Sequence, residues 1–221
     1  MYLFPAALLS SLCALATAQQ VPLSAAIDRF QFTTSTVPPF PASTQSSADT
    51  EALLVSQWSL GKGRVQDGPA NLAFVNDPFP NNPVPGPSTG GSSSPVLQVT
   101  YAAGSYSHDT GGAQFYTLWN TSDGTTDFAR MMVSYEIAFE GNFDWVKGGK
   151  LPGIRGGLDS TGCSGGNKAD GQECFSSRLM WRKGGTGEGM SARRNAEMAA
   201  NPEHQCMHTS RLQTTCARQR T

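Results

Sequence analysis

Lys150, Ser176 and Arg178 could together bind and stabilise an anion, because they supply two cations and a hydroxyl group. Arg178 could hold a carboxylate in fork geometry. Lys150 could act as a point charge, or move protons if burial lowered its pKa. Ser176 could orient the bound substrate. The alternative interpretation is an ordinary solvated cationic face that binds nothing.

The residues after Cys174 alternate with the period of a β-strand, in which positions i, i+2 and i+4 share a face. One face is mostly apolar and predicts a core: Phe175, Ser177, Leu179 and Trp181. The other face is mostly polar: Ser176, Arg178, Met180 and Arg182. We therefore expect a strand that presents a hydroxyl group and two permanent cations to an anionic ligand.

Lys150 lies among three glycines, Gly148, Gly149 and Gly153. Glycine allows the backbone to come close to another part of the protein or to a ligand. We therefore expect a close approach at this point of the chain.

Three motifs in this region resemble the fungal and algal-virus enzymes of polysaccharide lyase family 14, a group related to fungal glucuronan lyases. They are Lys147-Gly148-Gly149-Lys150-Leu151-Pro152-Gly153, Cys163-Ser164-Gly165-Gly166 and Phe175-Ser176-Ser177-Arg178-Leu179-Met180-Trp181-Arg182-Lys183. The resemblance extends upstream to about Thr33 and ends near Glu188. It implies an all-β jelly-roll sandwich that cleaves uronic-acid polysaccharides, of the alginate or glucuronan type, by β-elimination.

The chemistry of uronate lyases gives each candidate residue an expected role. A base removes the proton at C5, an acid protonates the leaving oxygen at C4, and cations stabilise the developing enolate. Lys150, Ser176 and Arg178 match positions that the family uses in catalysis. We expect Arg182 and His108 to contact the substrate. His108 precedes Asp109 and could be a base oriented by that carboxylate, although such a histidine is more often simply exposed.

The resemblance places the family's two catalytic tyrosines at Met190 and Ala192. Neither methionine nor alanine can act as a general acid or base. This departure leaves two classes of function: a lyase that is inactive or nearly so as written, and a non-catalytic carbohydrate-binding remnant of the same fold.

Composition and the N-terminal segment predict a secreted, monomeric, single-domain protein. The chain has 221 residues and a formal net charge of −1, which suggests one domain of sandwich size and gives no indication of nucleic-acid binding. Residues 1–18 read as a signal peptide, with an apolar run from Leu3 to Leu15 before Ala16-Thr17-Ala18. A membrane anchor is the alternative, but this run is too short to span a bilayer.

Removal of that signal would leave an even number of cysteines, Cys163, Cys174, Cys206 and Cys216, which favours disulfides in a secreted chain. We expect Cys163 and Cys174 to close a short Gly-rich loop. The competing zinc site fits no common ligand spacing. Asn120 begins an Asn-Thr-Ser glycosylation sequence. We expect no cofactor; calcium stays an open alternative, because no acidic run has a spacing that would decide whether it is bound.

Short alternating segments separated by Gly-rich loops indicate the all-β sandwich or jelly roll within residues 19–188. The segment 19–47 reads as an extended lead-in and 104–112 as a polar loop. A helix is expected over 47–58. Strands are expected over 96–101, 113–119, 129–140 and 175–182, of which 129–140 alternates most clearly.

The segment 189–221 differs from the rest, because it contains no Phe, Trp, Tyr, Val or Ile. It could be a basic tail that binds acidic polymer, or an irregular, disordered tail. We favour a third interpretation, a frameshift, retained intron or wrong gene model that leaves the jelly roll incomplete at its C-terminus. The strand bearing Ser176 and Arg178 would then lack a neighbour and leave an open edge.

Overall fold

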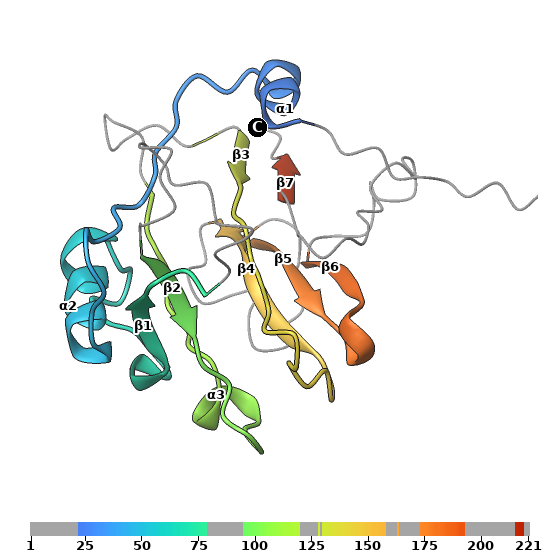
Figure 1. Ribbon diagram of the computed structural model, residues 1–221. Helices are drawn as coiled ribbons and strands as arrows, with labels where there is room; N and C mark the ends of the chain where they lie inside the picture. Colours follow the sequence, from blue (N-terminus) through green and yellow to red (C-terminus); the bar gives the residue numbers. More distant parts are fainter. Residues whose placement is uncertain are drawn as a thin grey trace, which may run out of the picture. The chain divides into compact units, whose positions relative to one another are not determined.

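The computed structural model describes residues 22–78, 95–119, 128, 130–157, 163, 173–192 and 215–218 (Figure 1). The chain divides into two compact units: Met1–Gln31 with Met132–Ala217, and Phe32–Met131 with Arg218–Thr221. The expected signal peptide, the Asn120 sequence and Cys206 lie outside the described residues. Within the described ranges, no helix is both long enough and apolar enough to cross a membrane.

In the second unit, helix α2 (Ser47–Gln57) confirms the helix that the sequence predicts. Its N-cap is Ser46, whose hydroxyl accepts a hydrogen bond from the backbone N–H of Asp49 at 3.2 Å. The buried Thr50 hydroxyl accepts the backbone N–H of Phe74 at 3.1 Å, which ties the helix to the neighbouring sheet.

That sheet consists of β1 (Leu72–Val75) and β2 (Val96–Val99), paired antiparallel. With α2 it encloses an apolar core of Leu54, Trp58, Leu60, Val65, Leu72 and Phe74. The expected strand over 113–119 is present only as isolated bridges, Gln114 to Asp67 and Thr117 to Leu60. The short helices η1 (Pro69–Asn71) and α3 (Ser107–Thr110) complete this unit, and α3 lies inside the predicted polar loop.

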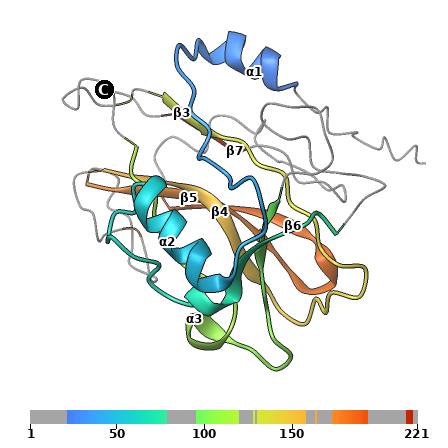
Figure 2. The same ribbon diagram turned by 60° about the vertical axis from the view of Figure 1, so that its left-hand side comes forward.

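The first unit contains a three-stranded antiparallel sheet of β4 (Gly149–Gly156), β5 (Phe175–Trp181) and β6 (Gly187–Ala192), with β5 in the centre (Figures 1 and 2). Helix η2 (Lys183–Gly185) connects β5 to β6. Helix α1 (Leu23–Phe30) also belongs to this unit, so the expected extended lead-in is helical over these residues.

One face of this sheet packs into an aromatic core. Leu151, Leu179 and Trp181 are buried there, and the partly buried side chains against them are Tyr135, Ile137, Phe139, Phe143 and Trp145. The rings of Phe139 and Trp145 have centroids 4.5 Å apart at an angle of 57°. Such pairs add about 0.5–1.5 kcal/mol beyond the area they bury.

The strand expected over 129–140 is regular only over β3 (Arg130–Val133), which pairs with β7 (Thr215–Arg218). The period-2 pattern nevertheless predicts the buried side correctly, because Tyr135, Ile137 and Phe139 all pack against the core. Beyond Val133 the segment is held by these side-chain contacts, which need no continuous ladder.

The expectation that β5 lacks a neighbour is wrong. β6 pairs with β5 from Gly187 opposite Trp181 to Ala192 opposite Ser176. A ladder is formed by backbone N–H and C=O groups, so it does not require the β-branched and aromatic residues that this segment lacks. The expected irregular tail therefore begins with a strand and also contains β7.

Candidate functional site

The register of β4 and β5 brings cations from both strands together. Lys150 lies opposite Met180, and Arg155 lies opposite Ser176. Directly opposed residues of an antiparallel pair share a face of the sheet. Lys150 and Arg155 therefore lie on the same face as Arg178, and we call Lys150, Arg155 and Arg178 the cationic face.

A β-bulge in β4 makes this arrangement possible. Between two paired positions β4 advances from Lys150 to Gly153, whereas β5 advances only from Met180 to Arg178, so β4 holds one extra residue. In an unbroken strand, residues 150 and 155 would point to opposite faces because their separation is odd. The bulge absorbs one residue and returns both cations to one face.

The opposite face of the same strands is the aromatic core, as the alternation after Cys174 predicts. Gly149 lies opposite Trp181, and Ile154 lies opposite Ser177. Leu151 and Ile154 are each only 7% exposed, although their numbers differ in parity. Their common burial agrees with the bulge between them.

The cationic face is accessible to an anion. Lys150 is exposed, and Arg155 and Arg178 are half-buried. Among the residues that the structure describes, no carboxylate forms an ion pair with Lys150 or Arg178. Neighbouring like charges repel, so an anion bound between them would lower the electrostatic energy of the face.

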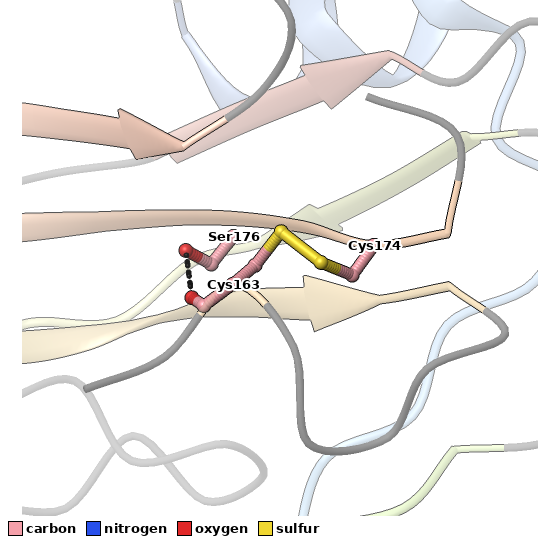
Figure 3. Close-up of a disulfide and its surroundings, with 3 residues drawn as sticks. All are labelled: Cys163, Cys174 and Ser176. Carbon is pink, nitrogen blue, oxygen red and sulfur yellow. Dashed lines mark hydrogen bonds between the residues drawn. A yellow bond between two sulfur atoms is a disulfide. The ribbon is translucent and has the colours of Figure 1, made fainter. Parts of the chain in front are cut away.

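Ser176 does not present the free hydroxyl that we expect from the sequence. Its side chain is 5% exposed, and its Oγ donates a hydrogen bond to the carbonyl oxygen of Cys163 at 3.0 Å (Figure 3). The expected Cys163–Cys174 disulfide is confirmed, with the two Cα atoms 5.8 Å apart. The bridge brings Cys163 over the start of β5 and covers Ser176, whose catalytic role stays a prediction.

Arg182 is already paired within the protein. Its Nε donates to Oε2 of Glu188, which lies at the start of β6. This hydrogen bond lowers the pKa of Glu188 and raises the pKa of Arg182. The pair links the two ends of the β5–β6 connection. A substrate would have to compete with Glu188 for Arg182, and the expected contact of Arg182 with substrate stays a prediction.

The glycines around Lys150 allow close contact with the protein itself. A Cβ atom at Gly149 would overlap the ring of Trp181, and one at Gly153 would overlap the backbone of Ser177 and Arg178. The expected close approach is confirmed, and the partner is the neighbouring strand β5.

The structure does not test the expected contact of His108 with substrate. The backbone of His108 lies in α3 of the second unit, whereas the cationic face belongs to the first, so this role stays a prediction.

Tyr135 donates its hydroxyl to the carbonyl oxygen of Pro152 at 3.1 Å. Burial raises the pKa of Tyr135, which makes this hydroxyl a neutral donor rather than a general base.

In the ranges that the structure describes, no three His, Cys, Asp or Glu side chains gather to hold a metal ion. The expected absence of a cofactor stays a prediction.

Positions 190 and 192 complete the neighbourhood of the cationic face. Met190 lies opposite Arg178, and Ala192 lies opposite Ser176. These are the two positions at which the resemblance expects tyrosines. The register therefore places both positions beside residues of the cationic face. Acid–base groups acting on a substrate bound there would have to lie at such positions.

Arg155 is the candidate that the sequence reasoning missed. Its number places it with the core face if β4 is read as a regular strand. Pro152 is the signal that could have corrected this, because proline inside a strand marks an edge or a bulge.

Comparison with known proteins finds a matching family model and a similar solved structure. The family model described as polysaccharide lyase 14 matches residues 89–219, so the expectation that the resemblance ends near Glu188 is wrong. The chain is similar to the marine PL-14 alginate lyase from Aplysia kurodai, with a TM-score of 0.53 and 27% sequence identity. The match covers 82% of this chain and 62% of that one, less than two thirds of the alginate lyase. This likeness confirms the all-β, jelly-roll type of fold. No curated protein matches.

Proposed function

Because the chain belongs to polysaccharide lyase family 14, we propose that it is a secreted lyase-type protein whose cationic face binds a uronic-acid polysaccharide of the alginate or glucuronan type. Its reaction is β-elimination, and turnover is slow or absent in this chain. The observation that carries the proposal is the juxtaposition of Lys150, Arg155 and Arg178 on one face of the sheet, with positions 190 and 192 beside them.

The cations account for substrate binding and for stabilisation of charge. In β-elimination the C5–H and C4–O bonds break, a C4=C5 double bond forms, and negative charge develops on the uronate carboxyl group. Arg178 can hold that carboxylate through two parallel hydrogen bonds. Lys150, on the neighbouring strand, adds a second positive charge where the enolate forms.

Proton transfer is the step that this chain supports poorly. Met190 and Ala192 have no ionisable group, although they lie opposite Arg178 and Ser176. Ser176 is buried and donates to Cys163, and the Tyr135 hydroxyl is held by Pro152. The lack of an acid–base group at positions 190 and 192 supports the second candidate function, a carbohydrate-binding protein of the lyase fold without turnover.

Export is part of the proposal. Residues 1–18 would be removed as a signal peptide, and the Cys163–Cys174 disulfide is of the kind that persists in oxidising compartments outside the cytosol. Recovery of the chain from culture medium with Gln19 at its N-terminus would support export. Retention inside cells with residues 1–18 intact would contradict it.

Calorimetry with a uronate oligomer tests the binding part. We expect binding that weakens as salt screens the cations, and no binding of a neutral glucan of equal length. Arg178→Ala should reduce the affinity at least tenfold, because charge-assisted hydrogen bonds are the strong ones. Lys183→Ala, on the exposed β5–β6 connection, is the matched control and should bind normally. Equal binding of the neutral glucan, or an Arg178→Ala variant with unchanged affinity, would contradict the proposal.

A further inference from the structure

The bulge in β4 has a specific contact from outside the sheet. The hydroxyl of Tyr135 donates to the carbonyl oxygen of Pro152, at a distance of 3.1 Å. Pro152 lies between Lys150 and Gly153, where the register of β4 shifts against β5. Pro152 also has no backbone N–H, so it cannot add a donor to the ladder. The Tyr135 hydroxyl therefore anchors the one stretch of β4 that is not regularly paired.

The position of Lys150 depends on this stretch. If β4 were regularly paired with all of its residues, a slip by one position would turn Lys150 toward the aromatic core and away from Arg155 and Arg178. The buried Leu151 and Ile154 oppose such a slip from the core side of β4. Gly149 and Gly153 have no side chains that could hold the bulge itself. The Tyr135 hydroxyl supplies a contact at that point.

We propose that Tyr135 is a positioning residue for the cationic face: by holding the Pro152 carbonyl it fixes the bulge and so keeps Lys150 beside Arg178. This inference rests on the proposed function, because the position of Lys150 matters only if the cationic face binds substrate. The hydrogen bond and the bulge from which it is argued do not depend on that function. The Tyr135 ring packs against the cluster of Leu151, Leu179 and Trp181. The aromatic core on one face of the sheet thereby sets the arrangement of charges on the other.

The properties of the hydroxyl suit such a permanent anchor. A phenol remains a hydrogen-bond donor only while it is protonated. Burial raises the pKa of Tyr135, so the contact survives throughout the neutral and mildly alkaline range.

Tyr135→Phe is the direct test, because it keeps the ring in the core and removes only the hydroxyl. We expect uronate-oligomer affinity to fall about fivefold, the equivalent of one ordinary hydrogen bond. We also expect the salt dependence of binding to fall toward that of Lys150→Ala, because Lys150 occupies its position beside Arg178 for less of the time. Tyr101→Phe is the matched control. Burial also raises the pKa of Tyr101, but it lies in the second unit, so its variant should bind normally.

A deletion of Pro152 turns the test into a double-mutant cycle. Without the extra residue, a regular β4 keeps Lys150 on the same face as Gly153, so the bulge and its anchor are no longer needed. Tyr135→Phe should therefore weaken binding in the natural chain and have no further effect in the deletion variant. Equal losses in both backgrounds would overturn the inference.

Amide hydrogen exchange and lysine reactivity test the inference without any polysaccharide. They also test it if the deletion variant fails to fold. We expect Tyr135→Phe to speed exchange at Leu151 and Gly153 and to change the reactivity of Lys150 toward an amine reagent, while Tyr101→Phe changes neither. If the natural chain binds no uronate, the proposed function fails and these two readouts still decide the role of Tyr135. Unchanged exchange and unchanged Lys150 reactivity would overturn it.

Discussion

Met190 on β6 lies directly opposite Arg178 on the central strand β5. Two residues further along, Ala192 lies opposite Ser176 in the same ladder. The two positions that lack an acid–base group are therefore the register neighbours of two of the three residues that the family resemblance marks as catalytic. Under the proposed function, the cations of the site are present and its proton-transfer groups are missing.

Gly149 is expected to be irreplaceable in β4. A methyl group there would overlap the Trp181 ring, so Gly149→Ala should lower the free energy of unfolding by about 1–3 kcal/mol through overpacking. Gly189→Ala in β6 is the matched control, because nothing lies within 4 Å of its added Cβ. Chemical denaturation of both variants measures the difference. Equal stability of the two variants would show that Trp181 is not packed on Gly149.

The disulfide should contribute substantially to the stability of the first unit. Cys163 and Cys174 are 11 residues apart, and closing a loop of this size stabilises the fold by about 3 kcal/mol, mainly by restricting the unfolded chain. The Cys163→Ser/Cys174→Ser variant should melt at a lower temperature than the oxidised protein. A reducing agent should lower the melting temperature of the natural chain by a similar amount and leave the double variant unchanged. No response of the natural chain to reduction would contradict the bridge.

The ion pair of Arg182 with Glu188 should give a small stabilisation that depends on pH. The folded-state pKa of Glu188 is lowered, chiefly by the hydrogen bond from Arg182. Its contribution is therefore present above the unfolded pKa of the carboxyl group and is lost as pH falls through the folded pKa. Glu188→Gln should melt slightly below the natural chain at neutral pH, and the two should converge in acid. A difference that grows on acidification would contradict this sign.

Sequence patterns predict part of the fold, since the segment 113–119 forms only isolated bridges and 129–140 is a regular strand only over Arg130–Val133. Helix α2 and strand β5 lie where expected, and the alternation after Cys174 separates the core face from the cationic face. The same alternation cannot show that Ser176 is covered, because that depends on the distant Cys163 carbonyl.

The two principal misses have different physical causes. Residue preferences do not predict β6, because Gly187 and Gly189 pair through their backbones. Large side chains of β5 lie opposite these two glycines. Arg155 is misplaced by simple alternation because the bulge at Pro152 changes the parity of β4. Both depend on a partner strand, which periodicity within a single segment does not include.

Restoring the missing groups tests the central claim most directly. Met190→Tyr/Ala192→Tyr should place two phenols opposite Arg178 and Ser176, and general acid–base catalysis typically contributes a factor of about 100 or more. The measurement is the rise in ultraviolet absorbance of the unsaturated product from alginate or glucuronan. We expect the double variant to exceed the natural chain at least about 100-fold, and an added Arg178→Ala to abolish the gain. A natural chain that degrades the polymer as fast as the double variant, or a double variant that binds uronate without any turnover, would contradict the account.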